Sequence, residues 1–165
     1  MKNKKVLLVG GCGFIGHNLA LHLRQMGHDI YLVDSFGVNN FITLLDNKDN
    51  LPNPDLSKKV LEERIDLIKD TSCNLLVQDA RDYHALSKAI DKINPEIVIQ
   101  LAAVSHADRS YKSPYNTFDH SLRTLENVLD AIKFAKSVEQ FIFMSSSMVY
   151  GNFDGKDVDE ETNCS

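Results

Sequence analysis

The fold is decided by residues 6–16, VLLVGGCGFIG, in which an apolar run passes directly into a glycine-rich turn. The apolar run is typical of a buried strand, and the amphipathic pattern that follows, over about residues 14–26, predicts a helix. A second apolar run, residues 30–33, ends in Asp34 and predicts another strand. The glycines of the turn satisfy two spacings, Gly11-x-Gly13-x-x-Gly16 and Gly10-x-x-Gly13-x-x-Gly16.

A turn of this kind, placed between a strand and a helix, predicts a dinucleotide site. One glycine lets the chain turn sharply, one lets the backbone approach a pyrophosphate, and one lets the helix pack on the sheet. Asp34, at the tip of the second strand, can accept both hydroxyls of an adenosine ribose and would repel a 2′-phosphate, which favours NAD over NADP. The alternative, a tight turn that binds nothing, is disfavoured by this acid and by the helix that the turn opens.

The 165-residue chain, 43% apolar and 25% charged, has the composition of one soluble globular domain. Its net charge of -5 argues against binding to nucleic acid or an anionic membrane, and no segment approaches the ~18 consecutive apolar residues of a membrane helix. The cysteines, Cys12, Cys73 and Cys164, lack the spacing of a disulfide framework or a zinc site. We therefore expect reduced thiols, no metal and a cytoplasmic protein.

Three further strands are predicted at residues 75–77, 97–101 and 141–144, and the first two of these are expected to be buried. Between the first two of these strands, residues 82–93 predict a helix. One face of that helix carries Leu86, Ala89, Ile90 and Ile93. Because apolar strands alternate with helices, the expected fold class is α/β, a doubly wound parallel sheet of the Rossmann type with five strands.

Residues 35–73 are the least regular part of the sequence, with loops rich in asparagine and proline. Within them we expect a helix capped by Asp55. Its inward residues are predicted to be Val60, Leu61, Ile65 and Ile68. We interpret this long connection as an insertion within one domain, not as a domain boundary.

Ser113 and Pro114 predict the start of a long helix that covers residues 114–136. The stripe of apolar residues along this helix is wider than one face. It consists of Tyr115, Phe118, Leu122, Leu125, Leu129 and Ile132, with Val128, Ala131 and Ala135 beside them. Either the whole stripe lies on the sheet, or one face packs on the sheet and the other on a partner subunit.

In such a sheet, ligands bind at the carboxyl ends of the strands. Asp79 follows the third strand, where its carboxylate can accept an adenine amino hydrogen or bond to local backbone instead. Ala102 and Ala103 follow the fourth strand and are small enough to let a ribose or nicotinamide pass close to the backbone. The fifth strand is followed by three serines, residues 145–147, whose hydroxyls can bond a substrate carbinol.

Five stretches with a recognisable pattern occur in order along the chain. They are residues 10–16, Val33-Asp34, Asp79 with Arg81-Asp82, Leu101-Ala102-Ala103, and SSSMVYG at residues 145–151. Together they resemble the NAD-dependent epimerase/dehydratase family, the extended short-chain dehydrogenases that act on nucleotide sugars. The likeness covers essentially the whole chain, and it is specific for the family and weak for the substrate.

The resemblance implies that Phe14 and Ile15 hold the pyrophosphate and that Asp79 and Ala80 hold the adenine. It also implies a UDP-, GDP- or dTDP-sugar as substrate and, in the full-length protein, a homodimer formed through the 114–136 helix. Ser146 occupies the family's catalytic serine or threonine position. The glycine motif and the resemblance together give as cofactor-binding residues Gly10, Gly13, Phe14, Ile15, Gly16, Asp34, Ser35, Asp79, Ala80, Leu101, Ala102, Ala103, Ser105, Ser121 and Ser145.

The chain departs from the family pattern at two places that bear on function. Early in the long helix the family has an asparagine and then a glycine, where this chain has Ser121 and Thr124, although Asn127 fits the pattern. Dehydratases of the family carry acids just after the catalytic serine, where this chain has Ser147 and Met148. The resemblance therefore disfavours 4,6-dehydration and leaves epimerisation, reduction or decarboxylation.

The family's Tyr-x-x-x-Lys pair, in which the tyrosine removes the sugar hydroxyl proton as hydride passes to NAD, is expected shortly after residue 165. Neither Tyr111 nor Tyr150 is followed by lysine four residues on. We therefore expect residues 1–165 to be an incomplete NAD-binding domain of an epimerase-like enzyme, inactive without its catalytic segment and substrate domain. The alternative is a non-catalytic NAD sensor or scaffold module.

Overall fold

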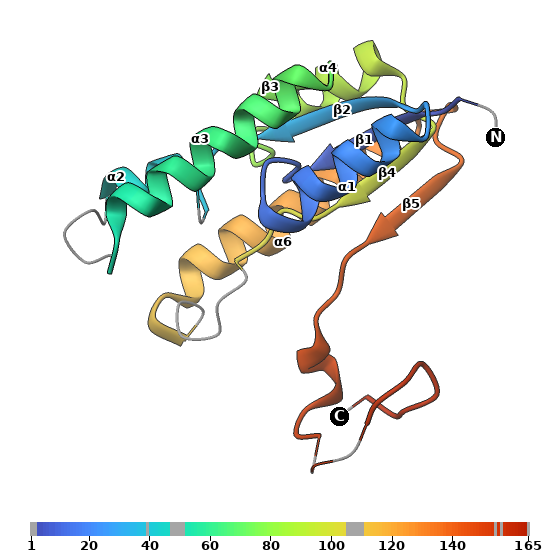
Figure 1. Ribbon diagram of the computed structural model, residues 1–165. Coiled ribbons are helices and arrows are strands. Elements are labelled where there is room, and N and C mark those ends of the chain that lie inside the picture. Colours follow the sequence, from blue (N-terminus) through green and yellow to red (C-terminus); the bar gives the residue numbers. More distant parts are fainter. Residues whose placement is uncertain are drawn as a thin grey trace.

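Five parallel strands form one sheet in the order β3-β2-β1-β4-β5 (Figure 1). This computed structural model describes residues 3–38, 40–46, 52–104, 111–153, 155 and 157–164. The strands within this part of the chain are β1 (Lys5–Val9), β2 (Asp29–Asp34), β3 (Asn74–Val77), β4 (Ile97–Gln100) and β5 (Gln140–Phe143). Each neighbouring pair is parallel, so the predicted doubly wound fold is confirmed.

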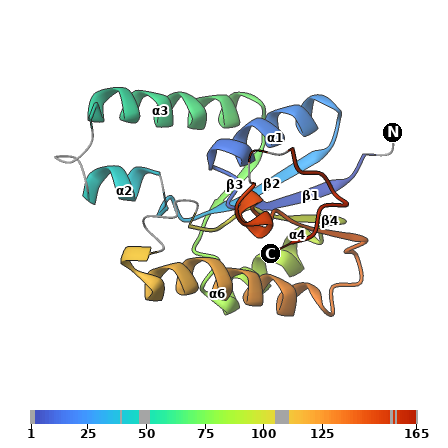
Figure 2. The same ribbon diagram turned by 90° about the horizontal axis from the view of Figure 1, so that it is seen from below.

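Helices cover both faces of the sheet. Figure 2 shows α1 and α3 on one side and α4 and α6 on the other. The helical segments are α1 (Phe14–Gln25), α2 (Phe41–Asp46), α3 (Pro54–Asp70), α4 (Tyr83–Ile93), α6 (Pro114–Ile132) and a short 3-10 turn, η2 (Ser147–Tyr150). No helix in the described part of the chain is long and apolar enough to span a bilayer.

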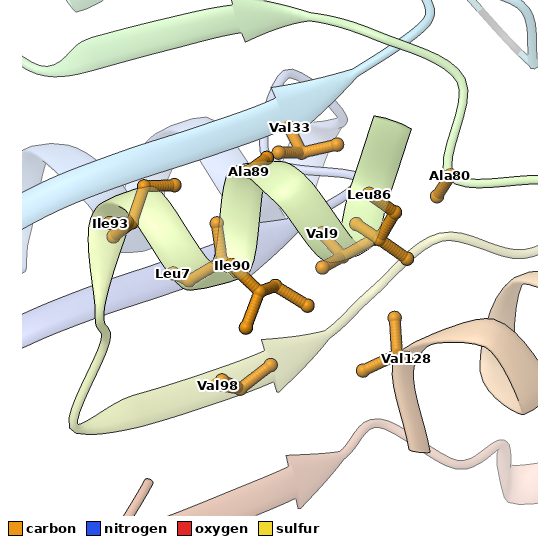
Figure 3. Packing of buried hydrophobic residues seen from close by; sticks show 10 residues of the cluster. All are labelled: Leu7, Val9, Val33, Ala80, Leu86, Ala89, Ile90, Ile93, Val98 and Val128. Carbon is orange, nitrogen blue, oxygen red and sulfur yellow. The ribbon is translucent and has the colours of Figure 1, made fainter. Parts of the chain in front are cut away.

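The central strand β1 is buried on both of its faces. Leu7 and Val9 pack with Leu86 and Ile90 of α4 on one side of the sheet (Figure 3). On the other side, Leu8 packs in the cluster that includes residues of α1 and α3. Continuous apolar runs in sequence are what a parallel sheet covered on two faces requires.

The edge strands are less buried than the central strand β1. The third strand was expected to be buried, yet Val77 of β3 is 68% exposed. Phe143 of β5 is also exposed. Both strands pair on one side only, so fewer neighbours cover their side chains.

Helix α4 matches its prediction, whereas α3 begins differently. The Asp82 side chain caps α4 by accepting from the N–H of Ala85. Helix α3 is capped by Asn53, not by Asp55, because Asn53 accepts from the N–H of Leu56 at 3.0 Å. The inward stripe of α3 contains Leu61 and Ile68, whereas Val60 is exposed, contrary to its predicted place.

The turn after β1 rests directly on the chain that leaves β4. Gly10 has a φ of +82°, a conformation that residues with a Cβ rarely adopt. A Cβ placed there would lie 2.6 Å from the backbone nitrogen of Ala102, so backbone meets backbone with no room for a side chain. The first glycine of the motif is therefore required by both conformation and space.

This double requirement can be separated by experiment. Gly27, after α1, also has a positive φ (+90°), but a Cβ there would meet no atom within 4 Å. We expect Gly27→Ala to lower the free energy of unfolding by about 1 kcal/mol, the cost of the left-handed backbone alone. Gly10→Ala should lower it by about 3 kcal/mol or more, because the clash adds to that cost. Equal losses in urea unfolding would contradict the close contact with Ala102.

Candidate functional site

The candidate site lies at the carboxyl edge of the sheet, where the strand order reverses around β1. The chain leaves β1 toward α1, and the strands that flank β1 are β2 and β4, so ligands are expected to bind in the crevice at this point. The glycine turn, Asp34, Asp79 and residues 101–103 all follow these strands. The structure thus places four groups of residues that are far apart in sequence at the carboxyl ends of the strands.

The first turn of α1 is open to an anion. Its N-cap residue, Gly13, provides no side-chain cap, and no acidic residue lies in the first turn. Phe14 is 74% exposed and Ile15 53% exposed, so the first turn of α1 lies at the surface of the described structure. A helix N-terminus with free N–H groups and the positive end of the helix dipole is suited to a phosphate group.

Asp34 lies beside this turn at the tip of β2. One carboxylate oxygen accepts from the N–H of Cys12 and the other from the N–H of Phe36, both at 2.8 Å. Burial raises the pKa of the Asp34 carboxyl, and these two N–H groups and the Arg64 guanidinium partly offset that rise. Each carboxylate oxygen retains a lone pair, so Asp34 can still accept ribose hydroxyls.

A pocket of about 380 Å³ opens next to Asp34. Ser35 and Asp79, two of the predicted site residues, line it, together with Arg81 and with Asn116 and His120 of α6. A volume of this order is that of a small-molecule site, and it suits one heterocyclic base with its ribose. Asp34 bonds to Cys12 of the glycine turn and is followed in the chain by Ser35, which lines the pocket, so the carboxylate adjoins both the turn and the pocket.

Asp79 is held by Arg81. The guanidinium donates to both carboxylate oxygens, with an Nη2 to Oδ2 distance of 2.6 Å, and the Arg81 N–H also donates to Asp79. Arg81 also lowers the pKa of the Asp79 carboxyl. The bond to local backbone, one of the two alternatives for this residue, is therefore present, while Asp79 also lines the pocket.

A chain of alternating charges continues from Asp79 to α6. Arg81 Nη1 lies 2.6 Å from Asp119, whose other oxygen accepts from Arg123 at 2.7 Å. Asn127 of the same helix donates to the carbonyls of Ala80 and Arg81, each at 2.9 Å. The loop after β3 is therefore fixed by side chains of α6.

The Ala80 side chain packs in the core (Figure 3), so this residue can meet a ligand through its backbone only.

The loop after β4 is fixed in the same way. Ser121 accepts from the N–H of Val104 at 3.1 Å. The buried Gln100 side chain donates to the Ala102 carbonyl at 3.0 Å and to the Thr124 hydroxyl at 3.3 Å. Ser121 and Thr124, which stand where the family has its asparagine and glycine, thus hold this loop in place by hydrogen bonds. Leu101 and Ala102 pack against the core while Ala103 is exposed, and the predicted site residue Ser105 lies outside the described residues.

The serines after β5 lie apart from the glycine turn. Ser145 and Ser146 are exposed, and Ser146 accepts from the N–H of Met148 at 3.2 Å as the cap of η2. Figure 1 shows the chain running on past the end of β5 before it turns in η2. In the described structure, Ser146 therefore lies beyond the carboxyl end of β5, and it does not contact Asp34 or Gly13.

Sequence reasoning missed the residues that hold the loops. Arg81 and Asp119 are 38 residues apart, and Arg64 of α3 bonds to the Cys12 carbonyl across 52 residues. No periodicity or local spacing links such pairs. The one available signal was Asn127, which fits the family pattern early in the long helix.

Arg81 generates a prediction about acid stability. The Asp79 pKa is lowered from its ordinary value of 3.8, so the stabilisation that Asp79 contributes is present above 3.8 and is lost as pH falls through the lowered pKa. We expect Arg81→Gln to lower the free energy of unfolding at pH 7 by about 1 kcal/mol, because the ion pairs are partly screened by solvent. In urea unfolding, the difference from wild type should shrink below pH 3.8. A difference independent of pH would show that Arg81 acts through packing alone.

With this geometry in place, comparison with known proteins is informative. The model of the NAD dependent epimerase/dehydratase family matches residues 6–165. The chain is 32% identical over 160 residues to dTDP-D-glucose 4,6-dehydratase of Dictyostelium discoideum, covering 97% of this chain and 33% of that protein. It is 30% identical over 164 residues to the uncharacterized UDP-glucose epimerase YtcB of Bacillus subtilis, covering 98% and 45%.

Among solved structures, one similar chain is the UDP-glucose 4-epimerase of Stenotrophomonas maltophila, crystallised with NAD and formylated UDP-arabinopyranose. The TM-score is 0.75 at 28% sequence identity, and the match covers 99% of this chain and 43% of that one. The chain therefore spans less than half the length of these relatives.

Proposed function

The chain belongs to the NAD dependent epimerase/dehydratase family, and from that membership we propose that it is the NAD-binding domain of a nucleotide-sugar epimerase. The observation that carries the proposal is the uncapped first turn of α1 beside the Asp34 carboxylate at the reversal point of the sheet. Because the match spans less than half of the relatives described above, we propose residues 1–165 as the cofactor part of a longer enzyme. The free cysteines fit a reducing compartment, the cytoplasm.

The site residues have separate roles in this proposal. The N–H groups of Phe14 and Ile15 bind the pyrophosphate, with Gly13 leaving room for it. Asp34 accepts the ribose hydroxyls, and Ser35 and Asp79 face the adenine. The remaining proposed contacts are Gly10, Gly16, Ala80, Leu101, Ala102, Ala103, Ser105, Ser121 and Ser145. When bound, NAD supplies a hydride acceptor at its nicotinamide.

We further propose that Ser146 binds the carbinol of the sugar. A serine hydroxyl can donate to the oxygen of a substrate and orient it, but it is not a base at neutral pH. The base therefore has to come from outside residues 1–165. Ser147 and Met148 stand where dehydratases of the family carry acids, which favours epimerisation over 4,6-dehydration although one similar protein is a dehydratase. A reductase or decarboxylase of the same family is the alternative.

A UDP-, GDP- or dTDP-sugar is the substrate class we propose. The support is the class of molecule in the names of the similar proteins, which include a UDP-glucose epimerase and a dTDP-D-glucose dehydratase. The chain itself contributes the cofactor side of the site, so the nucleotide and the inverted carbon are set elsewhere in the enzyme.

The cofactor proposal is tested by calorimetric titration of the 165-residue chain. We expect NAD and ADP-ribose to bind, and NADP to bind about tenfold more weakly or worse, because its 2′-phosphate meets the Asp34 carboxylate. Asp34→Ala should reduce this discrimination. The absence of saturable binding at about 1 mM NAD would overturn the proposal. Oxidation of a nucleotide sugar by the chain alone would overturn the assignment of the base to another segment.

We also propose that helix α6 forms a homodimer contact. Thr124 and Val128 face the sheet, whereas Phe118 is 60% exposed and Leu122 48% exposed, with Tyr115 and Leu129 also exposed on the helix. This arrangement matches the second interpretation of the wide stripe, in which one face packs on the sheet and the other on a partner subunit. Exposed aromatic and leucine side chains along one helix are suited to a second copy of the same helix.

The dimer proposal predicts a charge-sensitive self-association. Leu122→Glu places a carboxylate in the contact and should weaken dimerisation about tenfold in sedimentation equilibrium. Leu45→Glu is the matched control, because Leu45 of α2 is also exposed but lies outside the stripe. A monomeric wild type, or an equal effect of both variants, would contradict the contact. A well-behaved monomer at high concentration would also favour the alternative of a stand-alone NAD sensor.

A further inference from the structure

The backbone of Cys12 is held at both its N–H and its carbonyl by side chains that sequence reasoning did not connect. Its N–H donates to Asp34 at 2.8 Å. Its carbonyl accepts from Arg64 Nη1 at 3.0 Å and from Asn40 Nδ2 at 3.3 Å. The Cys12 side chain is fully buried in the core, so only its backbone atoms face this cluster.

Arg64 is an unusual arginine for a surface helix. It comes from α3, in the insertion between β2 and β3, and its Nε is buried without a hydrogen-bond partner among the described residues. No ion pair of Arg64 is found within the described part of the chain, where other arginines pair directly with carboxylates. Burial lowers the Arg64 pKa, and the Asp34 charge acts against that effect. A partly buried guanidinium that bonds to a carbonyl instead of a carboxylate points to a positioning role.

We propose that Arg64 is a positioning residue of the dinucleotide site, which fixes the Cys12 peptide so that Asp34 presents its remaining lone pairs to the ribose. The inference rests on the proposed NAD binding. The geometry gives the mechanism, because Arg64 and Asn40 hold the carbonyl of Cys12 while the N–H of the same residue bonds to Asp34. The insertion that carries α3 thereby takes part in cofactor recognition.

The charge of Arg64 has a second effect on the same carboxylate. The groups that act on Asp34 are the N–H groups of Phe36 and Cys12 and the Arg64 guanidinium, all of which lower its pKa against the effect of burial. Loss of the Arg64 charge therefore raises the Asp34 pKa. Because ionised Asp34 is the form that accepts both ribose hydroxyls, NAD affinity should then fall at a higher pH on the acid side.

The test compares NAD binding of wild type, Arg64→Gln and Asn40→Ala by calorimetry between pH 5 and pH 8. Arg64→Gln should weaken NAD binding about tenfold at neutral pH and move the acid-side loss of affinity upward. Asn40→Ala removes a donor to the same carbonyl without a charge, so it should weaken binding about threefold and leave the pH profile unchanged. Lys58→Gln removes a charge from an exposed position of the same helix and serves as the control, with NAD affinity close to wild type.

A second readout does not depend on the cofactor. Amide hydrogen exchange at Cys12 should accelerate in Arg64→Gln and in Asn40→Ala, because the peptide that bonds to Asp34 is less well held. Wild-type affinity, pH profile and exchange in both variants would overturn the inference. Should Arg64→Gln not fold, Arg64→Lys decides by the same measurements, because it keeps the charge and loses the planar guanidinium donor, so binding should weaken while the pH profile stays that of wild type. If wild type binds no NAD, the proposed function fails, while the exchange rates still decide whether Arg64 holds the turn.

Discussion

The contact of Gly10 with Ala102 is the constraint on which the site depends. At this point the turn after β1 touches the chain leaving β4, backbone against backbone, with a Cβ excluded by a distance of 2.6 Å. Because the two loops meet, α1 begins close to the sheet and its free N–H groups lie at the edge where the strand order reverses. A wider separation would put the phosphate site and the loop after β4 out of reach of one ligand. The glycine thus determines how closely the turn after β1 and the chain leaving β4 approach each other.

Each loop at this edge is fixed by a side chain from a helix. Arg64 of α3 bonds to the Cys12 carbonyl, Asn127 of α6 to the carbonyls of Ala80 and Arg81, and Gln100 with Thr124 to that of Ala102. Carbonyl groups at strand ends cannot continue the sheet ladder, so they need partners from elsewhere. Helices whose apolar faces are fixed by the core supply those partners at defined positions. The packing of α3 and α6 therefore sets the geometry of the loops.

The sequence predicted well what depends on local pattern. The glycine turn, the strands and the four inward residues of α4 follow from period and spacing, and all are observed. The errors fall where neighbours decide: Val77 is exposed because β3 lies at an edge of the sheet. Val60 is exposed because packing turns Leu61 and Ile68 inward, and Val60 lies on a different face of α3. The side chains that hold these loops could not be predicted, since Arg64 comes from an irregular insertion and the link from Arg81 to Asp119 joins segments far apart in sequence. The positions of Asp34 and Asp79 could be predicted from the local sequence, whereas the side chains that hold the loops around them are determined by tertiary packing.

The inward orientation of Cys12 and Ala80 has a consequence for how this site can change. Both residues offer backbone atoms at the sheet edge while their side chains pack in the core. The effect of a substitution at these positions therefore depends on whether the new side chain fits the space in the core, and not on how that side chain interacts with a ligand. At these two positions, an engineer who wishes to alter how the backbone meets a ligand would gain more from Arg64 of α3 and Asn127 of α6, which bond to that backbone, than from Cys12 or Ala80 themselves.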